Sequence, residues 1–184
     1  NVHAKANMGV QLQATSFQPG LQGCARRQLC AVRVCVDLTN DKLQNILEEI
    51  KLGSASTKRF KELSGGQQQR VSLVLATIHD PVLVLMDEPT SGLDPQSRRQ
   101  LWDRMESMRD KGHGILLTTH SMEEAEAVCD RIAIIDHGNV ITIDTPQAII
   151  DTNRDNPAVI SASRRGKITL EDVFIGLTGK TVRT

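Results

Sequence analysis

Residues 63–94 decide the fold of this chain, and they read LSGGQQQRVSLVLATIHDPVLVLMDEPTSGLD. Apolar residues recur at helical spacing from residue 67 to residue 78, which predicts an amphipathic helix. The run 82–86 is apolar without alternation, which is typical of a strand buried on both faces in the centre of a parallel sheet. A helix followed directly by such a strand indicates an α/β fold.

A turn of small residues precedes the predicted helix. Ser64, Gly65 and Gly66 have little or no side chain, so their backbone N–H groups can approach a ligand closely. A helix N-terminus also offers unpaired N–H groups and a partial positive charge, which together favour phosphate. An ordinary serine-capped helix has the same sequence pattern, so this turn alone indicates either a structural cap or an anion site.

Two adjacent carboxylates, Asp87 and Glu88, follow the predicted strand. Open α/β sheets bind their ligands at the carboxyl ends of the strands. Burying unpaired charge is costly, and a divalent cation would remove that cost. One acid can then hold Mg²⁺ while the other orients an attacking water. The structural alternative is a pair of solvated acids at a strand end.

Together these segments resemble the nucleotide-binding domain of ATP-binding-cassette (ABC) ATPases. Residues 63–67 match the LSGGQ signature without a substitution, and residues 83–88 match the Walker B strand with its catalytic glutamate. Residues 91–94 match the D-loop, His120 matches the switch histidine, and Gln13 fits the Q-loop position. Motifs in this order and spacing are far more specific than any one of them.

The resemblance implies a role for each matched residue. Asp87 helps to hold Mg²⁺ together with Gln13, and Glu88 orients the attacking water. His120 and Gln13 sense the γ-phosphate. The implied cofactors are ATP and Mg²⁺, and the implied partners are a transmembrane permease and a second ABC ATPase domain paired head to tail. The expected ATP contacts of the signature and D-loop are Ser64, Gly65, Gly66, Gln67 and Asp94.

The resemblance also implies a fold class and a division of the chain. We expect α/β architecture: a partial P-loop NTPase (RecA-like) core with the ABC helical subdomain and a C-terminal hairpin and helix. Residues 1–152 are expected to form the C-terminal part of an ABC ATPase domain, with the helical subdomain at about 14–80 and the rest of the core at 81–152. Residues 153–184 are expected to be an extension, whose last helix is similar to that of bacterial drug and antibiotic exporter subunits.

Capping residues, apolar spacing and turn residues predict the remaining elements. They indicate a strand at 8–12, a helix at 42–50, a helix opened by Asp94-Pro95 and packed through Leu101, Met105 and Met108, and a buried strand at 115–117. They further indicate a helix behind Ser121–Glu124, a hairpin at 132–143, a short helix from Thr145-Pro146, a loop at 153–167, and a helix capped by Thr169 and ended by Gly179.

Composition limits the classes of function. Lys and Arg number 22 against 22 Asp and Glu, and aromatic residues make up 2 %, which argues against a nucleic-acid-binding surface. The chain has no apolar run of bilayer length and no visible secretory signal. We therefore expect a cytoplasmic protein that reaches the inner face of the membrane through its permease. The four cysteines form no C-x-x-C pair, so free thiols are expected rather than zinc ligands.

Two features depart from the family pattern. Residues 22–36 hold three cysteines and no acid, which a local frameshift or genuine divergence would explain; we expect Arg26, Arg27 and Arg33 to form a solvated face. No G-x-x-x-x-G-K-[S/T] occurs in the 184 residues. Since the Walker A loop of the family precedes the Q-loop, and Asn1 is not an initiator methionine, we expect an incomplete chain. Such a chain would bind ATP weakly, hydrolyse none alone and expose an unpaired apolar sheet edge.

Three hypotheses follow. In the first, the chain is part of the ATPase subunit of an exporter of a small molecule. In the second, it belongs to a cytosolic ABC ATPase that acts on ribosomes or DNA; such proteins usually carry fused cassettes or a coiled-coil insertion, and neither is visible. In the third, it is a truncated or degenerate product without catalysis, which the missing phosphate loop and residues 22–36 support. The transported compound is not encoded in any recognisable motif.

Overall fold

The computed structural model describes residues 7–11, 57–163 and 167–179, together with residues 41, 45, 46, 48, 50, 52 and 55. Gln13, residues 22–36 and most of the helix expected at 42–50 lie outside the described residues. The chain divides into two compact units, residues 1–118 and 119–184, and each is described here by itself.

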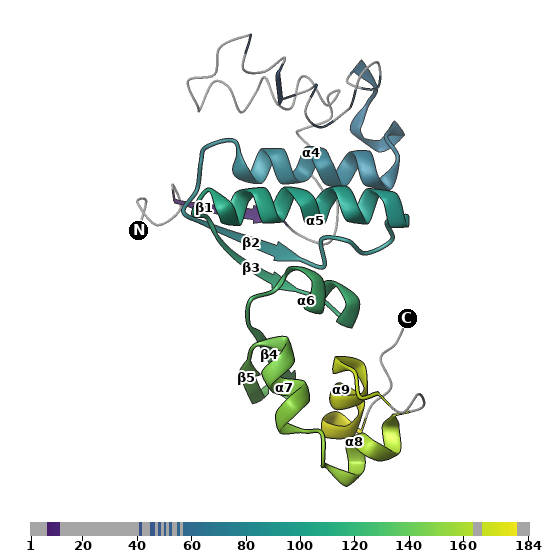
Figure 1. The fold of residues 1–184 in the computed structure, drawn as a ribbon. Helices are drawn as coiled ribbons and strands as arrows, with labels where there is room; N and C mark the ends of the chain where they lie inside the picture. The colour runs from purple at the N-terminus through teal and green to yellow at the C-terminus, as the bar shows by residue number, and fades with distance from the viewer. Residues whose placement is uncertain are drawn as a thin grey trace. The chain divides into compact units, whose positions relative to one another are not determined.

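A parallel sheet of three strands forms the centre of the first unit. Its order is β1 (Met8–Gln11), β2 (Leu83–Asp87) and β3 (Gly114–Thr118). Helices α4 (Gly65–Thr77) and α5 (Pro95–Asp110) lie side by side over one face of this sheet (Figure 1). Strand β2 is central in the sheet, as the sequence predicts.

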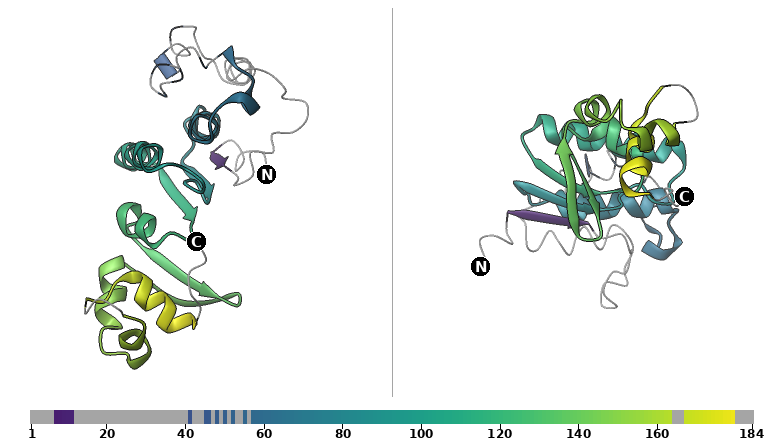
Figure 2. Two further views of the ribbon diagram at one scale, coloured as in Figure 1. Left: turned by 90° about the vertical axis from the view of Figure 1, so that its right-hand side faces the viewer. Right: turned by 90° about the horizontal axis from the view of Figure 1, so that it is seen from below.

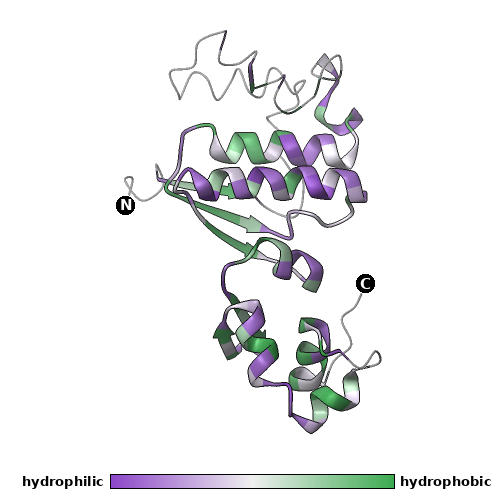
Figure 3. Cartoon of the chain, viewed as in Figure 1, coloured by the Kyte–Doolittle hydropathy of each residue, from purple (hydrophilic) through white to green (hydrophobic). Residues whose placement is uncertain are grey.

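The two faces of the sheet differ in exposure. On the face that the helices cover, Val84 is 0 % and Met86 is 2 % exposed. On the opposite face, Val10 is 51 % and Leu116 is 62 % exposed. The predicted burial of the strand at 115–117 is therefore wrong for Leu116, because α4 and α5 cover one face of the sheet. The predicted burial of β2 on both faces holds only in part, because Leu83 and Leu85 are partly buried on the opposite face. The strands are nevertheless largely apolar, as Figure 3 shows, and polar residues stand at their carboxyl ends.

Helix α4 begins two residues before the predicted helix and ends at Thr77. It packs directly on β1: a Cβ built on Gly9 would lie 2.0 Å from the carbonyl oxygen of Ala76. Only glycine permits that approach between a strand and a helix backbone. The short 3-10 helix η2 (Phe60–Glu62) precedes α4. A cluster of buried apolar residues surrounds both, namely Ile50, Leu52, Ala55, Phe60, Leu63, Val71 and Val74.

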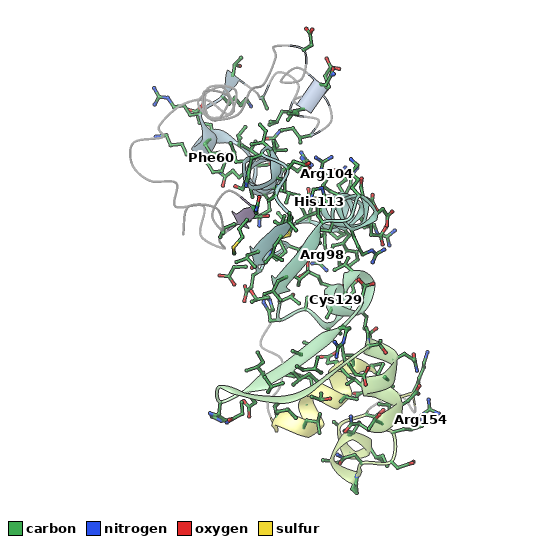
Figure 4. The ribbon with its side chains drawn as sticks, turned by 90° about the vertical axis from the view of Figure 1, so that its left-hand side faces the viewer. Phe60, Arg98, Arg104, His113, Cys129 and Arg154 are labelled. Atoms are coloured by element: carbon green, nitrogen blue, oxygen red, sulfur yellow. The ribbon has the colours of Figure 1, made fainter. Side chains whose placement is uncertain are left out.

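Helix α5 has the start and the core face that the sequence predicts. Asp94 is its N-cap and proline occupies its first turn, while Leu101, Met105 and Met108 are buried. Beyond the helix, His113 Nδ1 lies 2.7 Å from the carbonyl oxygen of Pro81, which links the loops that precede β2 and β3 (Figure 4).

The second unit combines a hairpin with four helices among its described residues (Figure 2). The hairpin turns through His137 and Gly138, whose positive φ angles of 47° and 77° are typical of a two-residue turn. In chain order the elements are α6 (Met122–Val128), β4 (Ile132–Asp136), β5 (Asn139–Asp144), α7 (Pro146–Thr152), α8 (Pro157–Ala162) and α9 (Leu170–Thr178). The hairpin, the short helix α7 and the capped helix α9 confirm the predictions.

Helix α8 corrects the loop predicted at 153–167. Asn156 caps this helix by accepting from the N–H of Ala158, and Pro157 occupies its first turn. Val159 of α8 is buried against α9, where a Cβ on Gly176 would lie 2.6 Å from its Cγ2. The polar composition of the segment hides a short apolar run, residues 157–160, from which α8 buries Val159. The domain boundary placed after residue 152 stays a prediction.

Candidate functional site

The start of α4 is closed by its own side chains. Ser64 Oγ accepts a hydrogen bond from the N–H of Gln67 at 3.3 Å, and Gln67 Oε1 accepts one from the N–H of Ser64 at 3.0 Å. This reciprocal pair is a capping box, which satisfies two N–H groups that a helix start leaves unpaired. The predicted contacts of both residues with ATP stay predictions, and the cap leaves further helix N–H groups to meet an anion.

The two glycines of the signature have different surroundings. A Cβ built on Gly66 would lie 2.5 Å from Ser97 Oγ and 3.0 Å from Ser97 Cβ, so the packing of α4 on α5 requires glycine there. A Cβ built on Gly65 would meet no atom of the described residues within 4 Å. The fold therefore gives no packing reason for glycine at position 65, whereas a ligand that approaches the backbone closely would give one.

The carboxylate of Asp87 is oriented by a neighbouring strand. Asp87 lies opposite Thr118 in the parallel register of β2 and β3. Thr118 Oγ1 donates a hydrogen bond to Asp87 Oδ1 at 2.5 Å. Sequence reasoning missed Thr118, because a threonine at a strand end has no motif of its own and is joined to Asp87 only by strand pairing.

Glu88 leaves the sheet in an unusual backbone conformation. Its φ angle is +45°, in the left-handed region that non-glycine residues seldom adopt. The N–H of Glu88 donates to the carbonyl oxygen of Thr118 at 3.0 Å, and the carbonyl oxygen of Glu88 accepts from the N–H of Ser91 at 3.2 Å. Such a conformation costs about 1–3 kcal/mol and persists where its surroundings hold it, often at functional sites.

The loop after Glu88 leads into the cap of α5. Asp94 Oδ1 accepts from the N–H groups of Gln96 at 3.1 Å and Ser97 at 3.0 Å. Hydrogen bonds from the side chain and the backbone of Ser97 lower the pKa of the Asp94 carboxyl. Earlier in this loop, the carbonyl oxygen of Pro89 accepts a hydrogen bond from Gln69 of α4, a residue that the sequence did not single out. The predicted contact of Asp94 with ATP stays a prediction.

His120 lies in the second unit, at its exposed beginning. The N–H of Ser121 donates to Thr119 Oγ1 at 3.0 Å, and Ser121 Oγ accepts from the N–H of Glu124 at 3.3 Å. These two bonds order the start of α6 immediately after the histidine. Asp87 and Glu88 belong to the first unit, so the predicted convergence of His120 on them stays a prediction.

The described part of the chain offers carboxylates that suit a magnesium ion bound jointly by the protein and a nucleotide. No group of three or more His, Cys, Asp or Glu side chains among these residues is arranged to hold a metal ion. Asp87 and Glu88 are adjacent carboxylates, and Mg²⁺ in nucleotide sites is held by one or two carboxylates while phosphates and waters supply the remaining ligands. The carboxylates therefore fit Mg²⁺ that arrives with a nucleotide.

Two further findings concern the rest of the described residues. Cys129 is a free thiol, as predicted, and burial raises its pKa to about 11, helped by the charges of Glu124 and Asp130 (Figure 4). A thiol of this kind stays protonated near neutral pH and reacts slowly. No helix in the described part of the chain has both the length and the apolar character needed to cross a bilayer.

Comparisons with known sequences agree with the motifs. A family profile described as "ABC transporter" matches residues 1–91. The Nod factor export ATP-binding protein I of Cupriavidus metallidurans is 34 % identical over 189 residues, covering 78 % of this chain and 62 % of that protein. The protein of the same name from Burkholderia lata is 44 % identical over 154 residues, covering 82 % of this chain and 50 % of that protein. The chain thus spans less than two thirds of either relative.

Solved structures confirm the predicted α/β class and the partial P-loop NTPase fold. The structure of an ATP-binding subunit of an ABC transporter matches with a TM-score of 0.74 and 24 % identity, covering 94 % of this chain and 69 % of that one. CbiO1 from Clostridium perfringens, part of the ABC transporter complex cbiONQ, matches with a TM-score of 0.65 and 23 % identity, covering 84 % of this chain and 66 % of that one.

Proposed function

We propose that the chain is an ABC transporter ATP-binding protein and forms part of a subunit that hydrolyses ATP to export a small molecule, which the family profile and the relatives support. The observation that carries the hydrolytic part is the end of β2. There, Asp87 is oriented by Thr118, and Glu88 follows in a left-handed turn whose N–H is held by β3. The oriented carboxylate of Asp87 suits metal binding, and the adjacent carboxylate of Glu88 suits activation of a water molecule beside that metal.

Each residue then has a specific task. Asp87 binds Mg²⁺, which when present neutralises charge on the nucleotide phosphates. Glu88 accepts a hydrogen bond from the attacking water and so orients it toward the γ-phosphate. The N–H groups at Gly65 and Gly66, which the capping box of Ser64 and Gln67 does not use, bind a phosphate at the start of α4, where Gly65 leaves space beside the backbone. His120 and Gln13 bind the γ-phosphate.

Transport across a membrane also requires a membrane-spanning partner. We propose a separate transmembrane permease and a second ATPase domain that pairs head to tail, which would place the protein at the cytoplasmic face of the membrane. Export is favoured over import because the two relatives described above are named as export proteins. The CbiO1 structure, which is part of a transporter complex, supports assembly with other subunits.

Glu88→Gln tests the catalytic role in the full-length protein. We expect ATP turnover to fall by about 100-fold or more, because the amide cannot accept a proton from water, while ATP binding persists. The matched control is Glu106→Gln, which removes an exposed carboxylate from α5. Turnover that is equal in wild type and Glu88→Gln would refute the assignment.

The 184-residue chain by itself should behave differently. It has no G-x-x-x-x-G-K-[S/T] to surround the phosphates, so we expect weak ATP binding and no turnover. Isothermal titration and a phosphate-release assay measure both properties. A turnover by the purified chain that Glu88→Gln abolishes would contradict this expectation.

A further inference from the structure

Gln69 connects helix α4 to the loop that follows Glu88. Its side chain is 6 % exposed, and its Nε2 donates a hydrogen bond to the carbonyl oxygen of Pro89 at 2.5 Å, across 20 residues of sequence. Both partners lie in the interior of the first unit. Burying a side-chain amide destabilises the fold unless the amide forms hydrogen bonds.

The bond to Pro89 restrains the turn from helix α4. Proline has no N–H, so its carbonyl oxygen is its one backbone group available for hydrogen bonding. On the other side, Glu88 is bonded through its N–H to Thr118 of β3. The left-handed residue Glu88 is therefore fixed between β3 and α4, and removing either restraint frees the backbone to relax from φ +45°.

Helix α4 is itself firmly placed against α5. Gly66 packs on Ser97 closely enough to exclude a Cβ, and Arg70 Nη1 donates to Gln100 Oε1 at 2.6 Å. These contacts hold the two helix starts together. The amide of Gln69 thus projects from a rigid support, which is what a residue needs if it is to position a neighbouring catalytic group.

We infer that Gln69 is a positioning residue of the proposed ATPase site, which sets the direction of the Glu88 side chain through the Pro89 carbonyl. The inference rests on the proposed function of Glu88, because it gives that residue a support. A carboxylate displaced by about 1 Å loses alignment with its water, and such a displacement can lower a rate by about 100-fold.

The test replaces the amide while keeping the helix. Gln69→Met has a similar length and no donor, and Gln69→Leu is a second variant of the same kind. The matched control is Gln100→Met, which removes the hydrogen bond between α4 and α5 but has no bond to the turn. In the full-length protein we expect kcat to fall by about 10- to 100-fold in both Gln69 variants with KM for ATP unchanged.

Amide hydrogen exchange provides a readout that does not depend on catalysis. The N–H groups of Ser91 and Leu93 bond within the turn, to Glu88 and Thr90 respectively, and we expect them to exchange faster in the Gln69 variants than in Gln100→Met. Unchanged exchange at these amides would overturn the positioning role. So would a fall in kcat that the control reproduces at an equal melting temperature, because general loosening would then account for it.

The two proposals fail in different ways. If Glu88→Gln keeps full turnover while the Gln69 variants speed exchange in the turn, the proposed function of Glu88 is refuted and the structural support by Gln69 stands. If Glu88→Gln is inactive while both Gln69 variants keep wild-type kcat, the proposed function stands and the positioning role is refuted.

Discussion

Alanine at each of the two signature glycines should have opposite effects on stability. A Cβ at position 66 would lie 2.5 Å from Ser97 Oγ and 3.0 Å from Ser97 Cβ, whereas a Cβ at position 65 would meet none of the atoms that the structure describes within 4 Å. Rotation of the serine hydroxyl relieves only the first contact, because its Cβ is fixed by the α5 backbone. The hydroxyl also hydrogen-bonds to Asp94, so moving it weakens the cap of α5.

The magnitudes follow from those distances. Overpacking of one methyl group costs about 1–3 kcal/mol, and alanine regains up to about 1 kcal/mol over glycine in a helix. We therefore expect Gly66→Ala to lower the free energy of unfolding by about 1–2 kcal/mol. Gly65→Ala should raise it by about 0.4–1 kcal/mol, because the unfolded chain loses freedom at no steric cost in the fold.

Urea unfolding measures both values, with the fluorescence of the single tryptophan, Trp102 of α5, as the signal. Ser97→Gly combined with Gly66→Ala should restore stability, with a coupling energy of about 1 kcal/mol or more in a double-mutant cycle. A Gly66→Ala protein as stable as wild type, without coupling to position 97, would refute the reasoning. Turnover adds a second test: Gly65→Ala should reduce ATPase activity although its fold is intact, if a ligand approaches that backbone.

Three further predictions concern other positions. Gly176→Ala should lower the free energy of unfolding by about 2 kcal/mol or more, because its Cβ would lie 2.8 Å from the backbone of Val159; unchanged thermal melting would contradict this. The lowered pKa of Asp94 means that its ionised form stabilises the fold above the unfolded value of 3.8, and that this stability is lost as pH falls through the folded pKa. Asp94→Asn should therefore flatten the acid dependence of unfolding below about pH 4, and an unchanged slope would count against the cap. Cys129, with a pKa of about 11, should react with iodoacetamide far more slowly at pH 8 than after unfolding, which mass spectrometry of its peptide measures; equal rates would disprove its burial.

Local chemistry explains why much of the site could be predicted from the sequence. Ser64 and Asp94 cap helices through atoms two or three residues away, so their short-range patterns are sufficient to identify both helix starts. Asp87 and Glu88 follow an apolar run, and the strand end is therefore recognisable without any tertiary contact. The family resemblance rests on these same segments.

Tertiary neighbours, rather than local sequence, determine the exposure of β3 and the formation of helix α8. Leu116 has the apolar character of a buried strand residue, but the described helices cover the other face of the sheet. Val159 lies in a segment with many polar residues, and its helix packs on α9 because Gly176 allows a close approach to it. A pattern of residue types cannot indicate which face of an element will find a partner.

By itself, the sequence determined the family resemblance, the order of helix and strand around residues 63–94, and the two adjacent carboxylates at the strand end. Only the tertiary structure decided how those carboxylates are held. Thr118 binds Asp87 across 31 residues and Gln69 binds Pro89 across 20, and such pairs form only when strand pairing and helix packing bring distant segments together. The distinction between Gly65 and Gly66 has the same origin, because it lies in the distance from each backbone to α5 rather than in the residue type.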